Sequence, residues 1–404
     1  MHISRLVKAS IALAIVAGPV SPVAAQQREP TRAGVIEQAQ AAKVKDLRPP
    51  VPTGGERFMN KVEDILVSGG LKWHPYFESA YSGAGFTLGG GYMDYVSAFN
   101  TLDGHASYSI AGYKRAEVVF SAPRLFERRA SLAVVGGWRE APQVGFWGVG
   151  PDTVETARTN YLFQQPYGSA TLDVRPTRRY LYLRGGVEVS KWKQEPGRGM
   201  FPSVETVYTP ATLPGLGASP RYLHTHGTVG FDWRESSGYA RRGGFYGVTL
   251  HDYKDNDDRF GFRQLDYEVI QHLPILRETW VISLHGLAQL SRPKSDQDVP
   301  FFMMPALGGG STLRGFTSWR FRDQNTLLLQ AEWRIMVNRF MDTAFFYDTG
   351  KVAPRASDLD LKDLKHNYGF GVRFHGPFTT PLRIELARSD ENSLQIVFAS
   401  SASF

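Results

Sequence analysis

A strict alternation of apolar and polar residues is the feature of this sequence that most constrains its fold. In residues 326–337 (TLLLQAEWRIMV), every odd position is apolar, whereas the even positions include Gln330, Glu332 and Arg334. Successive side chains of a β-strand point to opposite faces, so this pattern predicts a strand with one continuously apolar face. The same alternation occurs in residues 224–234, 280–290, 367–376 and 381–389.

Two architectures contain strands of this kind. A soluble antiparallel sandwich or barrel has its apolar side inside, whereas a membrane barrel turns that side toward lipid and keeps polar residues in the lumen. Alternation alone does not distinguish the two. The membrane barrel is favoured because the strands are long and often begin or end with Tyr, Trp or Phe, and because residues 71–404 show no domain boundary. The sequence therefore predicts an all-β fold, a transmembrane antiparallel β-barrel of about 16 strands over residues 71–404.

The end of the chain supports the same prediction. In SLQIVFASSASF, apolar residues lie at even-numbered positions and so share one parity: Leu394, Ile396, Phe398, Ala402 and Phe404. This parity predicts that the terminal aromatic ring lies on the apolar face of the last strand. A C-terminal phenylalanine on such a strand resembles the sorting signal of bacterial outer-membrane barrels, so Phe404 is the predicted sorting residue.

Residues 1–25 have the composition of a secretory signal peptide. Arg5 and Lys8 form a basic start, residues 11–18 are apolar, and the small residues of PVAA provide a cleavage site after Ala25. The apolar run is shorter than the roughly 20 residues that a membrane-spanning helix needs. We therefore expect export from the cytoplasm.

Residues 26–70 are predicted to be a periplasmic linker. The first part is rich in Gln, Ala, Pro, Lys and Arg, a composition typical of flexible segments. After it, Phe58, Val62, Ile65 and Leu66 recur at helical spacing and predict a short amphipathic helix. This helix either packs under a larger body or is a solvated spacer. The segment 26–70 is also a candidate contact for a periplasmic partner.

Composition argues against several classes of function. The chain has no cysteine, which removes disulfides, thiolate catalysis and cysteine metal ligands. Its net charge of +7 comes without a Lys/Arg-rich tract of the nucleic-acid-binding type, so no nucleic-acid partner is expected. His224 and His226 share one strand face at a spacing that can chelate a metal, but such a pair more often lines a polar lumen. His285 and His375 also have the polar parity, and we predict no catalytic residues, no metal and no cofactor.

Residues 308–316 (GGGSTLRGF) place three glycines shortly before Arg314. A phosphate-binding loop of the Walker type needs a lysine followed by Ser or Thr after the last glycine, and this segment has neither at that spacing. A G-x-S-x-G nucleophile turn is also absent, because Ser311 is followed by TLR. A surface loop with a solvated arginine is the plainest alternative.

The same segment resembles the RGF loop of the outer-membrane insertase superfamily, the bacterial surface antigen family of BamA-like and TamA-like barrels. The resemblance continues through QAEWR (330–334), FFYDTG (345–350), YGFGVRF (368–374) and PLRIELARS, and it ends with the terminal phenylalanine. Upstream, FDWRESSGYARRGGFYGVTL (231–250) is similar to a hairpin of the family.

The resemblance implies that the loop folds back into the barrel lumen. There Arg314, followed by Gly315 and Phe316, would form a latch whose acidic partners are Asp348 and Glu332. Strand parity agrees for Glu332, which lies opposite the apolar face of its strand. A guanidinium group can hold a carboxylate through two parallel hydrogen bonds, which a lysine cannot reproduce.

Three consecutive glycines, Gly308, Gly309 and Gly310, are the predicted hinge of this loop. Glycine adopts backbone conformations that other residues avoid, and it lets the backbone approach a wall closely. The resemblance further implies a place in the outer membrane, among outer-membrane lipids and lipopolysaccharide, and contact with the barrel-assembly machinery during biogenesis.

One departure from the family pattern leaves two functions open. Members that insert or secrete proteins carry periplasmic POTRA modules, and residues 26–70 are shorter than an ordinary domain. The first function is a membrane-biogenesis barrel that inserts or translocates protein or lipid and whose first and last strands open sideways. The glycine-rich residues 83–93 (GAGFTLGGGYM) support it, because glycine weakens a strand. The second is a passive pore or structural barrel without insertase activity.

Overall fold

A computed structural model describes residues 72–404 of the chain, except residues 178–179, 277, 377 and 401–403. The predicted signal peptide and the predicted linker with its amphipathic helix lie outside the described residues. Within the described part, no helix is both long and apolar enough to cross a membrane.

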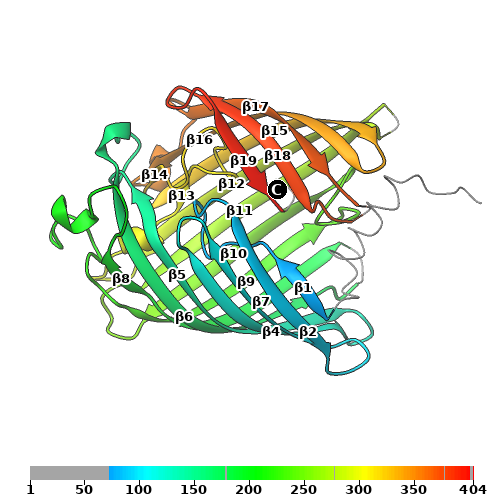
Figure 1. The fold of residues 1–404 in the computed structure, drawn as a ribbon, viewed down its shortest axis with the longest axis horizontal. Coiled ribbons are helices and arrows are strands. Elements are labelled where there is room, and N and C mark those ends of the chain that lie inside the picture. Colours follow the sequence, from blue (N-terminus) through cyan, green and yellow to red (C-terminus); the bar gives the residue numbers. More distant parts are fainter. Residues whose placement is uncertain (1–71, 178–179, 277, 377, 401–403) are drawn as a thin grey trace, which may run out of the picture. The chain divides into compact units, whose positions relative to one another are not determined.

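The strands of the main sheet form one antiparallel barrel in which successive strands of the wall lie side by side (Figure 1). The main sheet contains 17 strands, and a separate pair, β13 and β14, lies in one loop. Both β7 and β8 pair with β6 and are separated only by Trp192, so they are one interrupted strand. The described residues therefore contain sixteen strand positions, which confirms the predicted barrel of about 16 strands.

The strands and short 3-10 helices (η) follow one another along the chain. They are β1 (Trp73–Tyr76), β2 (Thr87–Tyr95), β3 (Thr101–Ser109), β4 (Lys114–Leu125), β5 (Ala130–Phe146), η1 (Glu155–Ala157), β6 (Thr159–Val174), β7 (Leu181–Lys191), β8 (Lys193–Pro196), η2 (Val204–Thr206), β9 (Arg221–Asp232), β10 (Gly243–Asp255), β11 (Phe262–Ile275), β12 (Trp280–Pro293), η3 (Phe301–Met303), β13 (Ala306–Leu307), β14 (Phe321–Arg322), β15 (Asn325–Asn338), β16 (Met341–Ala353), η4 (Ala356–Asp358), β17 (Lys365–Phe374), β18 (Leu382–Ser389) and β19 (Gln395–Ala399).

Polar side chains are buried inside the barrel, and apolar side chains are exposed outside it. On β15, Gln330 and Glu332 are each 3% exposed, whereas the neighbouring Trp333 is 37% exposed. A soluble barrel would show the opposite arrangement. The outer surface is therefore built to face lipid, and the alternation found in the sequence has the predicted meaning.

The two ends of the barrel differ in the length of their connections. Residues 147–158, 197–220 and 294–324 connect strands at one end, which we call the loop end. Residues 126–129 and 339–340 are among the short connections at the opposite end, the turn end. Outer-membrane barrels show this difference, with long extracellular loops and short periplasmic turns.

Aromatic residues from several loops pack together in the lumen near the loop end. Phe301 of the 294–324 loop lies 5.0 Å, between ring centroids, from both Phe146 of β5 and Tyr161 of β6. Leu213 from the 197–220 loop is buried in the same cluster. The long loops are therefore folded onto the inner wall and fill this part of the lumen.

The first and last strands have the least pairing in the barrel wall. The four residues of β1 pair with β2 opposite Gly89, Gly90, Gly91 and Tyr92, and β19 contributes five residues that pair with β18. Among the described residues, no residue register joins β19 to β1 or β2. The glycine-rich segment of the sequence thus lies at this seam, where its low strand propensity has the largest effect.

The position of Phe404 corrects one prediction. Pairing between β18 and β19 ends at Ala399, opposite Arg383, so the parity of the strand no longer determines where Phe404 points. Its ring instead stacks on His285 of β12, with 4.9 Å between ring centroids. His285 is buried in the lumen, so the terminal ring does not lie on the outer apolar face. A role of Phe404 in sorting stays a prediction.

Candidate functional site

The loop between β12 and β15 carries the RGF segment into the barrel. Its base is a short hairpin, in which Ala306 pairs with Arg322 and Leu307 pairs with Phe321. Arg314 lies near the tip of this hairpin and is 0% exposed. The structure therefore places Arg314 inside the barrel, where the resemblance put it, and not in solvent at the surface.

Two of the three predicted hinge glycines have backbone conformations that require glycine. Gly308 has a φ of 115° and Gly309 a φ of 99°, in a region that residues with a Cβ rarely adopt. A Cβ on Gly308 would lie 2.3 Å from the carbonyl oxygen of Thr317. Gly310 has no such backbone conformation, but a Cβ there would lie 2.7 Å from a methyl group of Val397 on β19.

Arg314 binds both acidic residues that the sequence predicted. Its Nε donates to Oδ2 of Asp348 at 2.8 Å, and its Nη2 donates to Oδ1 at 2.5 Å, which makes a bidentate contact. Its Nη1 donates to Oε1 of Glu332 at 2.6 Å. The guanidinium carbon also lies 3.6 Å from the ring centroid of Phe346. Geometry of this kind gives the strongest form of arginine–carboxylate contact.

A third carboxylate, Glu385 of β18, was not predicted. Arg314 Nη1 donates to its Oε1 at 3.2 Å, and Arg373 of β17 donates to the same oxygen at 2.9 Å. Arg373 also holds Glu332 through two hydrogen bonds of 2.5 and 2.7 Å. Arg383 donates to Glu385 at 2.6 Å and to the carbonyl oxygen of Gly310 at 2.8 Å.

These six side chains form what we call the latch network. It contains three arginines and three carboxylates, all 3% exposed or less: Arg314, Arg373, Arg383, Glu332, Asp348 and Glu385. The charges balance, as burial requires, because a buried charge without a partner is very costly. Burial lowers the pKa of Arg314, but the charges of Asp348 and Glu332 outweigh it and the net pKa is raised, so the group stays charged.

Neutral groups complete the coordination of Asp348. Asn367 Nδ2 donates to its Oδ2 at 2.8 Å, and Gln330 Nε2 donates to its Oδ1 at 3.1 Å. Gln330 also donates to the loop carbonyl oxygen of Thr312 at 2.8 Å. Asp348 is therefore held by the loop and by both strands that flank its own strand.

Gly315 and Phe316 fix the loop next to Arg314. A Cβ on Gly315 would lie 2.6 Å from the Cβ of Asn367, so the backbone approaches the wall as closely as glycine allows. The Gly315 carbonyl oxygen accepts a hydrogen bond from Ser389 at 2.8 Å. Phe316 is fully buried, and its ring lies 5.2 Å from that of Phe321.

Two further residues tie the same loop to other parts of the loop end. Arg320 donates two hydrogen bonds, of 2.6 and 2.7 Å, to Glu391 between β18 and β19, and it also binds Thr153. Trp319 donates to the carbonyl oxygen of Ser82 at 3.0 Å. Sequence motifs did not indicate these contacts, which depend on how distant loops meet.

Comparison with known proteins finds a family match for the second part of the chain. A model of the Omp85 superfamily domain matches residues 231–404, which include every residue of the latch network. This part of the chain is therefore similar to the Omp85 superfamily domain. The predicted resemblance to outer-membrane insertase barrels is therefore confirmed.

Solved structures show the same fold at low sequence identity. BamA from Haemophilus ducreyi lacking POTRA domains 1–3 is 14% identical, with a TM-score of 0.59, and the match covers 81% of this chain and 69% of that one. CdiB from Escherichia coli is 12% identical, with a TM-score of 0.54, and the match covers 78% of this chain and 59% of that one. CdiB from Acinetobacter baumannii is 11% identical, with a TM-score of 0.50 and coverage of 78% and 55%. The match spans less than two thirds of either CdiB chain, and no curated protein matches the sequence.

At the turn end, the region that matches the Omp85 model has a second contact across the barrel. Residues 233–242, which connect β9 and β10, form what we call the crossing turn. Its Tyr239 donates a hydrogen bond of 2.7 Å to Asp342 of β16 and stacks on His375 at 3.8 Å between ring centroids. Arg334 of β15 donates to the carbonyl oxygen of Ala240. Three strands separate β10 from β16 in the sheet, so this turn reaches across the barrel.

The histidine pair noted in the sequence belongs to a group of three in the lumen. His224 Nε2 lies 3.0 Å from Nδ1 of His251, and the rings of His224 and His226 lie 5.3 Å apart. The stacked ring of Tyr253 covers His224 at 4.1 Å. Among the described residues, no group of three or more His, Asp or Glu side chains is arranged to hold a metal ion.

Proposed function

We propose that this protein is an outer-membrane barrel that inserts or translocates protein or lipid through a lateral seam between its first and last strands. The observation that carries this proposal is the contrast between the latch network and the seam. Glu332, Asp348, Arg373 and Glu385 lie on four consecutive strands, β15 to β18. Arg314 and Arg373 therefore cross-link the wall up to the strand before β19.

The seam itself has none of this support among the described residues. The strand β1 has four residues and faces three consecutive glycines of β2. Each lost strand pair lowers the cost of separating the wall, and glycine adds little packing. Because strands β15 to β18 are held rigidly and the neighbouring seam is weakly paired, the barrel wall opens at the seam. The backbone groups exposed there can then pair with an incoming strand.

The location follows from the same proposal. We infer that residues 1–25 direct export, that residues 26–70 lie in the periplasm, and that the barrel lies in the outer membrane among phospholipid and lipopolysaccharide. The support is the signal-peptide pattern, the apolar outer surface and the Omp85 domain. The barrel-assembly machinery is the proposed partner during biogenesis, and residues 26–70 are the proposed contact for a periplasmic partner. The proposed activity is not enzymatic.

A structural barrel without insertase activity is the second candidate. The hydrogen bonds of Arg320 and Trp319 and those of the crossing turn favour it, because they hold the loop and the turn inside the lumen in one arrangement. A passive pore receives less support, since the loops fill the lumen near the loop end.

The test compares two glycine substitutions in liposomes that contain the purified protein. Gly90→Val adds a β-branched residue to β2 opposite Pro75 of β1, where a Cβ meets only the carbonyl oxygen of His74, at 3.8 Å. Gly104→Val is the matched control on β3, where a Cβ would have no neighbour within 4 Å. We expect the native protein to accelerate folding of an added outer-membrane barrel, Gly90→Val to reduce the acceleration, and Gly104→Val to preserve it.

Each alternative outcome has a defined meaning. Ion conductance without any acceleration of folding supports a pore and contradicts the insertase proposal. Neither conductance nor acceleration supports the structural barrel. Equal loss of acceleration in Gly90→Val and Gly104→Val would place the activity somewhere other than the seam.

A further inference from the structure

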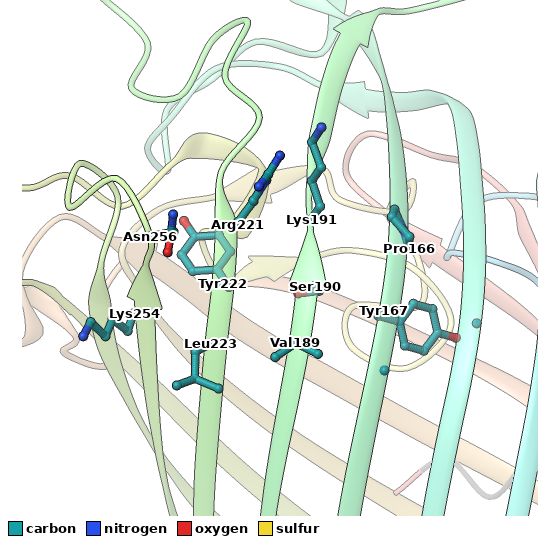
Figure 2. Close-up of a pocket in the computed structure, with 12 residues that line it drawn as sticks. Pro166, Tyr167, Val189, Ser190, Lys191, Arg221, Tyr222, Leu223, Lys254 and Asn256 are labelled. Atoms are coloured by element: carbon teal, nitrogen blue, oxygen red, sulfur yellow. The ribbon is translucent and has the colours of Figure 1, made fainter.

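A cavity of about 660 Å³ lies along neighbouring strands of the barrel wall, near their loop end (Figure 2). Lys191 of β7, Arg221 of β9 and Lys254 of β10 line it, together with Val189 and Leu223. Figure 2 shows Lys191 and Arg221 on adjacent strands, both pointing toward the loop end, with Val189 and Leu223 below them. We call these five residues the cation groove.

The cation groove lies on the outer face of the barrel. On β9, Tyr222 is buried, whereas the next residue, Leu223, is 43% exposed. Side chains two residues apart share a face, so Arg221 lies on the same outer face as Leu223. On β7, the same rule puts Lys191 beside Val189, which is 59% exposed.

Strand register brings the positive charges together. Lys191 lies directly opposite Arg221, and Lys254 lies directly opposite Leu223. Like charges directly opposite each other destabilise a sheet. Among the described residues, no ion pair or side-chain hydrogen bond compensates Lys191, Arg221 or Lys254. The sheet therefore gains stability when an anion lies between these side chains.

The neighbouring cations on the same outer surface are neutralised by the protein itself. Arg263 of β11 donates to Asp252 at 2.9 Å, and Lys294 donates to the same carboxylate at 3.1 Å. The absence of an acidic partner is therefore a property of the cation groove and not of the whole rim. Lys191, Arg221 and Lys254 need an anion from outside the chain.

Small residues make room for that anion. Gly168 of β6 lies opposite Gly136 of β5 on one side and opposite Val189 on the other. A Cβ on Gly168 would have no atom closer than 3.9 Å, and one on Gly136 would have none within 4 Å. The wall beside the cations is therefore open, and the apolar side chains below it continue the lipid-facing surface.

We propose that the cation groove binds a phosphorylated lipid of the surrounding membrane. Lys191, Arg221 and Lys254 hold the phosphate, and the acyl chains lie along Val189 and Leu223. A guanidinium and an ammonium group provide charge-assisted hydrogen bonds to phosphate oxygens, and basic pockets at the edge of a membrane bind lipid head groups in this way. The proposal rests on the membrane location proposed above but not on insertase activity, so it can fail or succeed separately.

The experiment measures lipid binding to the full-length protein in detergent by native mass spectrometry. The probes are bisphosphorylated lipid A, the same lipid without phosphates, and inorganic phosphate. We expect the native protein to bind only the phosphorylated lipid, and we expect Lys191→Gln/Arg221→Gln to bind it about tenfold more weakly or worse. Arg388→Gln is the matched control, because Arg388 is an exposed outward cation of β18 that lies opposite Tyr368.

A charge-preserving double variant, Lys191→Arg/Arg221→Lys, separates charge from folding and should keep the binding. The proposal is overturned if Lys191→Gln/Arg221→Gln binds as the native protein does, or if Arg388→Gln loses as much affinity. Equal binding of the lipid without phosphates would remove the role of the cations. Equal binding of inorganic phosphate would remove the role of Val189 and Leu223. A heat-modifiability gel confirms that each variant remains a folded barrel.

Discussion

The latch network and the crossing turn hold the same strand at its two ends by different chemistry. On β16, Asp348 of the latch network accepts four side-chain hydrogen bonds, two of them from Arg314, whereas Asp342 accepts a hydroxyl donor from Tyr239 at the turn end. The latch consists of full charges with balanced partners, and the crossing turn consists mainly of neutral donors. Breaking a contact of the latch network leaves a buried charge without its partner, whereas breaking the contact of Tyr239 in the crossing turn removes one hydrogen bond. The two ends should therefore differ in how much stability one substitution removes.

Arg314→Ala should have the largest effect. It leaves Asp348 without its bidentate partner and leaves Glu332 and Glu385 with an excess of negative charge. Leaving a buried charge without its partner costs about 3–5 kcal/mol. The free energy of unfolding, measured by urea titration of the barrel in detergent, should fall by about this amount. A loss equal to that of an exposed-arginine control, Arg388→Ala, would show that the charges are not coupled.

Arg314→Lys should have an intermediate effect. It keeps the positive charge but removes the fork, which is the planar guanidinium group that makes two parallel hydrogen bonds to one carboxylate. A lysine provides a single ammonium group and cannot reach Asp348 and Glu332 in the observed geometry. We expect a loss of about 2 kcal/mol in the same titration, the order of one charge-assisted hydrogen bond. A loss as large as that of Arg314→Ala would mean that the fork, and not the charge, provides all the stability.

Tyr239→Phe should have a smaller effect at the turn end. The substitution removes the hydrogen bond to Asp342 but leaves His375, whose Nε2 lies 3.1 Å from the same carboxylate. A loss of about 1.5 kcal/mol is expected in the free energy of unfolding. Tyr208→Phe is the matched control, because the Tyr208 ring packs in the loop-end cluster and its hydroxyl has no hydrogen bond within the described residues. If both variants lose the same stability, the contact between Tyr239 and Asp342 does not hold the turn.

Phe404→Ala should have the smallest effect on the folded barrel. The ring stacks on His285 and, at 6.3 Å between ring centroids, on His272, and these contacts together are worth about 1 kcal/mol. In cells, however, a sorting role predicts a clear loss of protein in the outer membrane, measured by fractionation. Equal amounts of native and variant protein in the outer membrane would contradict the sorting role.

The sequence was sufficient for the barrel and for the centre of the latch. Alternation showed which residues face the lumen, and the RGF segment indicated Arg314, Asp348 and Glu332. Glu385 was missed although it has the polar parity, because parity gives the face of a residue and not its height along the barrel. Height depends on register, such as the pairing of Glu385 with Gly371, and register follows from the whole set of strand pairs.

Contacts between distant loops were beyond the reach of the sequence. The crossing turn lies in a segment that was noted only as a family hairpin, and no local pattern shows that Tyr239 reaches Asp342. Phe404 was misplaced for a related reason, since parity was extended past Ala399, where strand pairing ends. Period-two arguments hold only as far as the ladder of backbone hydrogen bonds continues.

The most direct test of the latch is a double-mutant cycle between Arg314 and Asp348. The free energies of unfolding of Arg314→Ala, Asp348→Ala and the double variant are compared with that of the native barrel in the same detergent. We predict that the double variant loses little more than either single variant, which gives a coupling energy of about 2 kcal/mol or more. Additive losses, with a coupling energy near zero, would contradict the claim that Arg314 holds the loop to the wall through Asp348.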